Sequence, residues 1–315
     1  MERKVQILII VHQEWCIEKL HHSCTIFFLN LRSTIEMKMS RKFIALVLFL
    51  FIGQSAVHAQ YRTNASRSEI GFMIGGSYYI GDLNPFMPYR NTNLAGGLVY
   101  RYNIHSRLSF RANFTYSKLE GYDSDSKEAL LVDRNLSFHT NIFELGAGIE
   151  FNYFPFQLGH DRYKGTAYVL AEIALFRMNP KTIADDGGEI DLQPLGTEGQ
   201  GSPLNSKSYG LTQLAIPIGL GAKISLGEKA SINFEVGLRK TFTDYIDDVG
   251  SGSYVDPTLL AAENGPLSAE LSNRSLSGSR FGRRGNATTN DWYVFSGVMF
   301  TFRLGSPVRC NPRWQ

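Results

Sequence analysis

Apolar residues occupy every second position along one stretch of the chain, Leu214–Leu226. The sequence there is LAIPIGLGAKISL, and small or polar residues fill most of the alternate positions. A period of two is typical of a β-strand with one apolar face. At ~3.3 Å per residue, such a strand extends ~43 Å, enough to cross a hydrocarbon layer at a tilt. Pro217 lacks an N–H group, so we expect a bulge or local bend there.

Seven further stretches show the same alternation, and the eight are joined by connections of alternating length. The connections after the first, third, fifth and seventh stretch are long, and the others are shorter. This order is typical of an up-and-down barrel with short turns at one rim, whereas a Greek-key sandwich does not sort its loops by parity. We therefore predict an all-β fold: an eight-stranded antiparallel up-and-down transmembrane β-barrel with long extracellular loops. The seven stretches are Glu69–Ile80, Asn93–Tyr102, Leu108–Lys118, Asn141–Phe154, Thr166–Phe176, Ala230–Thr243 and Asp291–Arg303.

The polar faces of these stretches carry charges that would be strongly destabilising if buried without partners. Inside a small barrel such charges can pair with one another. Eight strands leave an interior filled by side chains rather than an aqueous channel, so a pore function is disfavoured. The residues expected to face the interior are Arg101, Arg111, Glu144, Glu150, Glu172, Lys223, Glu235 and Arg239, with Gly146, Gly148, Gly219, Gly221 and Gly237. The aromatic residues expected to form girdles at the membrane surfaces are Tyr78, Tyr79, Tyr100, Tyr102, Phe151, Tyr153, Trp292 and Tyr293.

The segment Met37–Ala59 has the layout of a secretory signal peptide. Basic residues come first, an unbroken apolar run covers Phe43–Ile52, and small residues Val57 and Ala59 precede Gln60. We therefore expect residues 1–36 to lie upstream of the true translation start and 37–59 to be the signal peptide. Residues 60–303 are then the outer-membrane barrel domain, and 304–315 are a periplasmic C-terminal tail. The expected location is the cell outer membrane.

The charge balance gives no basic surface of the kind that nucleic-acid binding requires. Residues 1–59 hold seven of the 32 Lys and Arg residues and four of the 29 Asp and Glu residues, so 25 of each remain. Cys310 is the only cysteine after residue 59, which argues against an internal disulfide framework and a cysteine-based zinc site. We predict no cofactor, no nucleic-acid partner and no small-molecule substrate.

The last long connection begins with a cluster of aspartates whose spacing does not match an EF-hand loop. A solvated rim and a cation site both stay open as interpretations. Asp256-Pro257 is an N-cap followed by proline, and Gly265 follows eight residues later, so we predict a short helix between them. The candidate functional loop comprises Asp244, Tyr245, Asp247, Asp248, Tyr254 and Asp256.

A barrel enzyme working at the long-loop rim is a further class to consider, with the aspartates and His139 as its reactive groups. Hydrolysis or acyl transfer requires a histidine held by an acid beside a nucleophile or a water. His105 and His160 lie in the short connections, at the opposite rim from His139. We therefore predict that the protein is not an enzyme and has no catalytic residues.

Several runs of sequence resemble the PorG family. Thr241–Val249 reads TFTDYIDDV, Tyr254–Asp256 follows it, and together they resemble a signature of that family. Ala171–Lys181, Pro194–Gly201 and Asn290–Tyr293 are similar to it as well, and the likeness covers essentially all of residues 68–302.

PorG proteins are outer-membrane barrels of the type IX secretion and gliding machinery in Bacteroidetes. The resemblance implies a structural, partner-binding component surrounded by outer-membrane lipids and associated with a periplasmic ring of a lipoprotein and its partner subunit. It implies no catalytic set. Gly250 departs from the pattern, which leads us to expect serine there. A generic small barrel that anchors the envelope is the alternative.

Cys310 follows the last predicted strand, on the periplasmic side of an even-stranded barrel. A lone cysteine in an oxidising compartment is either a free thiol or part of a disulfide to another chain. We hypothesise the latter, which makes Cys310 a candidate partner contact. Non-reducing electrophoresis of native membranes should then show a slower band that Cys310→Ser abolishes. Identical mobility of the two proteins would contradict the hypothesis.

Overall fold

A computed structural model describes residues 67–305, apart from 86, 161, 186, 251 and 279–282. The expected upstream segment, the expected signal peptide and Cys310 lie outside the described residues.

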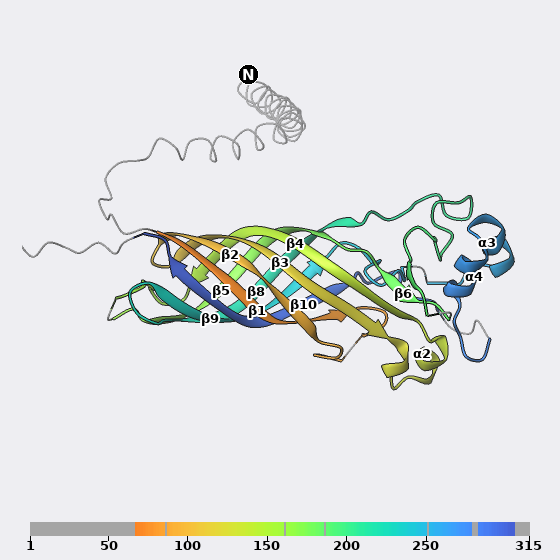
Figure 1. Ribbon diagram of the computed structural model, residues 1–315, viewed down its shortest axis with the longest axis horizontal. Helices are drawn as coiled ribbons and strands as arrows, with labels where there is room; N and C mark the ends of the chain where they lie inside the picture. Colours follow the sequence, from red (N-terminus) through yellow and green to blue (C-terminus); the bar gives the residue numbers. More distant parts are fainter. Residues whose placement is uncertain are drawn as a thin grey trace, which may run out of the picture. The chain divides into compact units, whose positions relative to one another are not determined.

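Eight antiparallel strands form a closed barrel, as predicted (Figure 1). Neighbours in the chain pair with one another, and the first strand pairs with the last along its full length, which closes the ring. Closure leaves the barrel without a free sheet edge. The strands are β1 (Ser68–Ile80), β2 (Asn93–His105), β3 (Leu108–Tyr122), β4 (Ser137–Asn152), β5 (Gly165–Arg177), β8 (Thr212–Ser225), β9 (Ala230–Thr241) and β10 (Trp292–Arg303).

The long loops lie at one end of the barrel and contain short elements of their own (Figure 1). The hairpin of β6 and β7 extends the sheet beside β4, through the pair His139 and Lys181. No helix in the described part of the chain is long and apolar enough to cross a membrane. These elements are η2 (Asp123–Asp125), α2 (Ala129–Arg134), β6 (Lys181–Ile183), β7 (Glu189–Asp191), α3 (Pro257–Glu263) and α4 (Pro266–Ser272).

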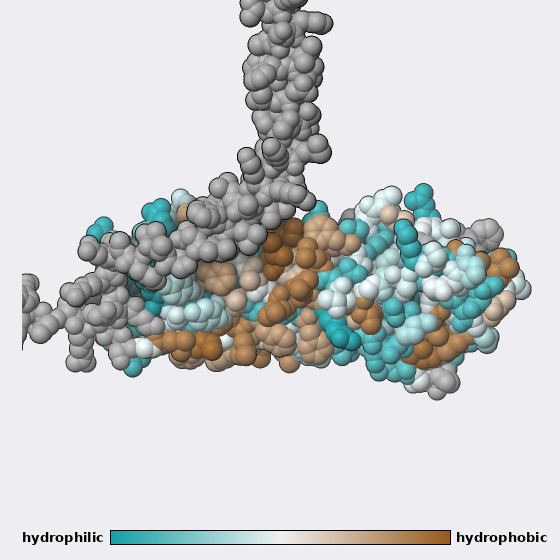
Figure 2. Space-filling model, turned by 90° about the horizontal axis from the view of Figure 1, so that it is seen from above, coloured by the Kyte–Doolittle hydropathy of each residue, from teal (hydrophilic) through white to brown (hydrophobic). Residues whose placement is uncertain are grey.

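Exposed apolar side chains form a belt around the strands. In Figure 2, hydrophobic residues concentrate over the strands, whereas hydrophilic residues predominate toward the loops. A closed barrel with such a belt is the β-structure that crosses a membrane, because its backbone groups are all paired and its outer face is apolar. The protein is therefore an outer-membrane β-barrel. Belt residues include Ile70, Phe72, Ile74, Leu98, Phe114, Leu145, Ile149, Val169, Ile173, Ile218, Leu220, Phe234 and Val236.

Strands β3 and β4 continue beyond the belt, where the polarity of their two faces is reversed. Phe114 and Tyr116 are exposed apolar residues, but the next outward positions are Lys118 and Glu120, which form an ion pair at 3.2 Å. Over the same length the inward side chain of Leu119 is fully buried. The barrel thus extends past the lipid as a water-facing structure with an apolar interior.

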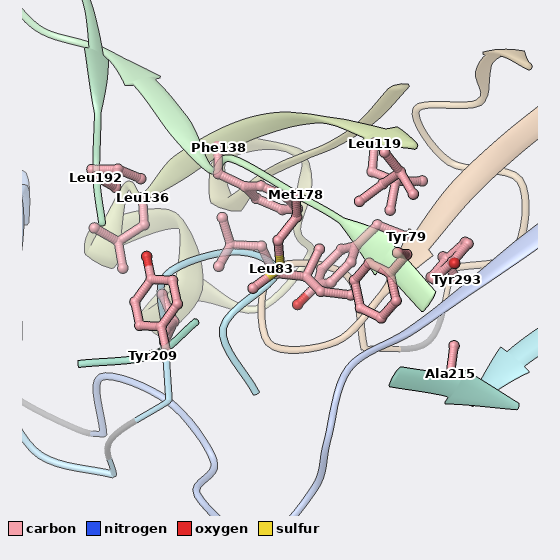
Figure 3. Packing of buried hydrophobic residues seen from close by; sticks show 14 of the residues in the cluster. Tyr79, Leu83, Leu119, Leu136, Phe138, Met178, Leu192, Tyr209, Ala215 and Tyr293 are labelled. Carbon is pink, nitrogen blue, oxygen red and sulfur yellow. The ribbon is translucent and has the colours of Figure 1, made fainter. Parts of the chain in front are cut away.

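An apolar core fills this upper part of the barrel (Figure 3). Tyr79 packs edge-on against Phe138 with 4.8 Å between the ring centroids, and Tyr293 packs against Phe176. Burial of Tyr79, Tyr293 and Tyr78 corrects their predicted place in a girdle: Tyr79 and Tyr293 belong to this core, while Tyr78 packs beside Tyr89. The strand period alone did not reveal the change in surroundings. Tyr100, Tyr102, Phe151 and Tyr153 are exposed near the short turns, where a girdle was expected.

Pairing of β8 is interrupted near Pro217 on one side only. Toward β5, Ala215 pairs with Ala174 and Ile218 with Ala171, and no pairs are formed between them. Toward β9, the register runs unbroken through Pro217 and Arg239. Because the register is unchanged across the gap, the bulge, one of the two predicted alternatives, is wrong; the other, a local bend, stays a prediction. The missing N–H is accommodated by a local loss of pairing.

Replacing Leu220 by arginine should destabilise the barrel, because Leu220 is 65% exposed in the middle of the belt. A cation at that depth costs about 2–4 kcal/mol in a lipid bilayer. Leu130 on α2 is the matched control, since it is 66% exposed but outside the belt. Leu130→Arg should change the free energy of unfolding from phospholipid vesicles very little. Equal effects of the two substitutions would contradict the assignment of the belt.

Candidate functional site

The four long loops form one hydrogen-bonded assembly, which we call the cap. It comprises the described residues within 81–92, 123–136, 178–211 and 242–291. The longest loop, 242–291, is bonded to each of the other three. The linking pairs are Asn286 N to Asp82 Oδ2 at 3.0 Å, Ser277 Oγ to Asp133 Oδ2 at 2.8 Å and Ser268 Oγ to Gly196 O at 3.2 Å.

The short helix predicted after Asp256 is confirmed as α3. The Asp256 carboxylate accepts hydrogen bonds from the backbone N–H groups of Thr258 and Leu259, and Pro257 occupies the first helical position. Asp256 is therefore an N-cap that starts a helix, and not part of the aspartate cluster.

The Arg284 side chain links the loops of the cap through an ion pair and several hydrogen bonds. Its guanidinium is buried and forms an ion pair with Glu198. It also donates to the carbonyl of Asp248 at 3.0 Å, to Thr197 Oγ1 at 3.0 Å and to the carbonyl of Ser272 at 3.2 Å. One side chain thus joins two loops and the end of α4.

Arg134 fastens the remaining two loops in the same way. It pairs with Asp123 within its own loop at 2.6 Å, and it donates to the carbonyl of Asp82 at 3.0 Å in the loop after β1. It also donates to the carbonyl of Arg284. The two arginines are therefore connected in series, and together they tie all four loops.

Asp248 and Tyr245 belong to a buried part of the candidate loop. Asp248 accepts hydrogen bonds from Thr197 Oγ1 at 2.5 Å and from the Tyr209 hydroxyl at 2.6 Å. Burial raises the pKa of Asp248 to about 6, although Arg284 opposes the shift. The Tyr245 ring stacks on Tyr209 with 4.6 Å between centroids. Burial raises the pKa of Tyr245 to about 12.

The tyrosine ring also accounts for the glycine that departs from the PorG-like pattern. A Cβ atom at Gly250 would collide with the ring of Tyr245. Serine at this position would require the Tyr245 ring to shift from its place against Tyr209.

The Tyr79 hydroxyl bridges two buried carboxyl groups. It lies 2.7 Å from Asp247 Oδ2 and 2.6 Å from Asp291 Oδ1. A hydroxyl has one hydrogen to donate, so one of these two bonds must be donated by a protonated carboxyl. Burial raises the pKa of Asp247 and of Asp291 well above the usual range, and the repulsion between the two carboxylates adds to the shift of Asp247. The pair therefore retains a proton at neutral pH.

Asp244 and Tyr254 are half-buried in the cap. Burial raises the pKa of Asp244 to about 8, and the charges of Asp247, Asp82 and Glu198 add to the shift. Within the described residues, no group of three or more His, Cys, Asp or Glu side chains is placed to hold a metal ion. The aspartates instead accept protein hydrogen bonds, such as that from Val249 N to Asp247 Oδ1 at 2.9 Å. The cation interpretation of this loop finds no support.

His139 lies on the outer flank of β4 and not among the aspartates. Its Nε2 atom is 2.6 Å from Glu189 Oε1, and Lys181 lies 3.1 Å from the other oxygen of the same carboxylate. Hydrogen bonds thus hold His139 to the β6–β7 hairpin. The structure does not bring His139 together with the loop aspartates that an enzyme at this rim would use.

The predicted charged interior is confirmed below the cap, and all eight of its charged residues are buried. Arg101 pairs with Glu69 at 3.0 Å and with Glu150 at 2.9 Å, and Lys223 also pairs with Glu150. The other pairs are Arg111 with Glu235, Arg111 with Glu172 at 3.2 Å and Arg239 with Glu144 at 3.6 Å.

The end opposite the cap is covered by the connection between β4 and β5. Phe156 and Leu158 are buried, and the Lys223 ammonium lies 5.0 Å from the centroid of the Phe156 ring. Between this cover and the cap, paired charges fill the barrel. The interior is therefore a packed layer, in agreement with the expectation for eight strands.

The residues that fasten the cap were not found from the sequence. The candidate loop included Asp247 and Asp248, but not their partners Tyr79, Tyr209 and Arg284. These partners carry no spacing signal, because Tyr79 and Tyr209 belong to another strand and another loop, and Arg284 lies 36 positions from Asp248 within the same loop. The sole local hint was the length of the loop itself.

A family model described as Domain of unknown function (DUF6089) matches residues 41–258. The chain belongs to the DUF6089 family. A search of curated proteins finds no match.

Three solved structures illustrate what the DUF6089 barrel is similar to. Neisserial surface protein A shares 9% identity over 77% of this chain and 100% of that chain, with a TM-score of 0.39. The N-terminal β-barrel domain of Pseudomonas aeruginosa OprF shares 12% identity over 76% and 100%, with a TM-score of 0.32. Ail, the attachment invasion locus protein of Yersinia pestis, shares 10% identity over 76% and 99%, with a TM-score of 0.37. Similarity this distant carries no conclusion about function.

Raising the pH should loosen the cap. The pKa values of Asp244, Asp248 and the Asp247–Asp291 pair are raised above the unfolded value of ~3.9. Their contribution to stability is thus fully present below that value and is lost as the pH rises through the folded values, about 6 for Asp248 and about 8 for Asp244. Protection factors from hydrogen exchange at Ile246 and Val249 should fall between pH 6 and pH 9.

The variant Asp291→Asn tests the shared proton directly. Its amide nitrogen can donate to the Tyr79 hydroxyl at any pH, as the protonated carboxyl does, while its oxygen accepts from Ile246 N. The fall in protection with pH should therefore be smaller in this variant than in the wild type. An unchanged pH profile would contradict the shared proton.

Arg284→Met should open the cap but leave the barrel intact. Removing one partner of a buried ion pair costs about 3–5 kcal/mol, and the substitution also deletes three hydrogen bonds within the cap, of which the one to Thr197 joins two loops. The neighbouring Arg283 is exposed, so Arg283→Met is the matched control with the same change of charge. Limited proteolysis should cut the loops of Arg284→Met much faster than those of the control. Equal rates would show that Arg284 does not fasten the cap.

Proposed function

We propose that this DUF6089 barrel is a structural, partner-binding component of the type IX protein secretion and gliding machinery. In this role it associates with a periplasmic ring complex built from a lipoprotein and its partner subunit. The proposal combines the PorG-like sequence with the architecture of an outer-membrane barrel.

The observation that carries the proposal is the filled interior. The Arg101 and Arg111 guanidinium groups are buried and paired with glutamates from several strands. A substrate that passed through the barrel would have to break these pairs, at a cost of several kcal/mol for each charge. A barrel that cannot serve as a conduit acts through its surfaces, as a component of a larger assembly does.

The position of the PorG-like signature supports the same role. Within Thr241–Val249, the side chains of Ile246 and Val249 belong to the apolar core, and Asp247 and Asp248 accept buried hydrogen bonds. The signature therefore builds the cap. A cap fastened in this way presents a preorganised surface at the long-loop end, which lowers the entropic cost of binding a partner on the exterior. Association with the periplasmic ring would involve the opposite end of the barrel.

A generic envelope-anchoring barrel is the second candidate function. The belt and the two covered ends fit that role equally well, since an anchor needs a stable barrel and no specific partner. The two candidates differ in what accompanies the barrel in the membrane.

Cross-linking in native membranes followed by capture of the tagged barrel separates the candidates. We expect the ring lipoprotein and its partner subunit to be recovered with the barrel and not with a tagged outer-membrane barrel of another family. Recovery of neither ring protein, from membranes in which the tagged barrel shows heat-modifiable migration, would overturn the proposal and leave the anchor. Loss of secretion without recovery of ring proteins would also count against direct association.

A further inference from the structure

The short connections at the end opposite the cap form a continuous surface, which we call the short-turn rim. It comprises residues 106–107, 153–160, 162–164 and 226–229, with Arg67 and Arg303 beside them. Contacts between the connections hold it together. These are Phe156 N to Ser106 O at 2.9 Å, Ser225 N to Lys164 O at 2.7 Å, Gly159 N to Ser225 Oγ at 3.3 Å and Arg303 Nη2 to Leu158 O at 2.6 Å.

The short-turn rim is basic although the long loops are acidic. Its connections contain four Lys and Arg residues and two acidic residues, and Arg67 and Arg303 add two more cations. The cap loops contain 17 Asp and Glu residues but nine Lys and Arg residues. The four rim cations Arg107, Arg162, Lys164 and Lys229 are all exposed. Balanced total charge therefore conceals a separation of charge along the barrel.

Large apolar side chains are exposed among these cations. Tyr153 is 66% exposed and Leu226 is 58% exposed, and both lie in the connections themselves. Ile104 and Leu304 are also exposed, beside Arg107 and Arg303 respectively. Tyr100 and Tyr102 continue this apolar surface into the belt. The rim is thus an extension of the lipid-facing surface to which positive charge has been added.

We propose that the short-turn rim binds the phosphate groups of anionic phospholipids in the periplasmic leaflet. Cations mixed with aromatic and aliphatic side chains are the chemistry of surfaces that sit in a lipid headgroup layer, and clusters of Lys and Arg there attract anionic lipids. Continuity with the belt favours lipid over an acidic protein as the occupant. By binding these phosphate groups, the rim sets how deeply the barrel sits in the membrane.

Electron spin resonance of spin-labelled lipids tests the proposal and needs no secretion partner. The full mature chain is reconstituted in phosphatidylcholine vesicles that contain a trace of labelled phosphatidylglycerol or labelled phosphatidylcholine. We expect the barrel to immobilise phosphatidylglycerol several-fold more strongly, and high salt to reduce that preference by screening. The preference is the ratio of immobilised labelled phosphatidylglycerol to immobilised labelled phosphatidylcholine. Replacing Arg107, Arg162, Lys164 and Lys229 by glutamine should bring this ratio close to one.

The matched control replaces four cap cations, Arg90, Lys127, Lys207 and Arg283, by glutamine and should keep the preference. Equal affinity of the wild type for both lipids, or an equal loss in both fourfold variants, would overturn the proposal. An acidic protein that binds the rim while the lipid preference is absent would also overturn it.

If the rim variant shows no heat-modifiable migration, the single variants Arg107→Gln and Lys229→Gln replace it. Each should lower the preference by roughly fivefold or less, and no decrease in either would refute the proposal.

Discussion

The pairing of charges inside a closed barrel is the constraint on which the rest of this structure depends. Closure removes the sheet edges, but it also directs one face of every strand into a space too narrow for bulk water. Arg101, Arg111 and Lys223 can occupy that space because glutamates from other strands face them. Glycines make room for the network. A Cβ atom at Gly221 would collide with the ring of Tyr168, whose hydroxyl donates to Glu235 at 2.7 Å.

Beyond the membrane, the polarity of the two faces of the strands is reversed. Within the belt, apolar side chains point outward and charges point inward, whereas beyond it Lys118 and Glu120 point outward and Leu119 points inward. Alternation continues through β3 without interruption, but the apolar face has changed sides. A barrel of this kind can therefore carry a conventional apolar core above its charged layer, and that core supports the cap.

This reversal explains how much of the fold could be predicted. Strands within the belt follow a simple period of two with bulky apolar residues on one face, so their positions were found to within a few residues. The prediction ended the third strand at Lys118 and began the fourth at Asn141, because the expected apolar face ends there. The structure continues them to Tyr122 and from Ser137. Hydrophobic alternation reports which side of a strand is apolar, and it loses the strand when the surroundings change.

In the cap, features that depend on adjacent residues were predicted, whereas contacts between residues far apart in the chain were not. The helix after Asp256 was predicted because its cap and its proline are adjacent in the chain. The roles of Asp247 and Asp291 were not predicted, because Tyr79 is separated from them by 168 and 212 positions. Arg134 and Arg284 likewise join distant parts of the chain, 150 positions apart for Arg134 and the Arg284 carbonyl and 86 for Arg284 and Glu198. Only closure of the barrel brings these residues together, so the cap depends on the fold that the belt determines.

The two ends of the barrel differ in charge because their charged side chains are arranged differently. At the cap, carboxyl groups are crowded enough that some retain protons, and buried arginines hold the loops against the remaining repulsion. At the short-turn rim, Phe156 and Leu158 are buried against the end of the barrel, and the cations of the connections remain on the surface. A folded acidic cap and a basic rim joined by an apolar belt therefore make the two ends of the barrel chemically different.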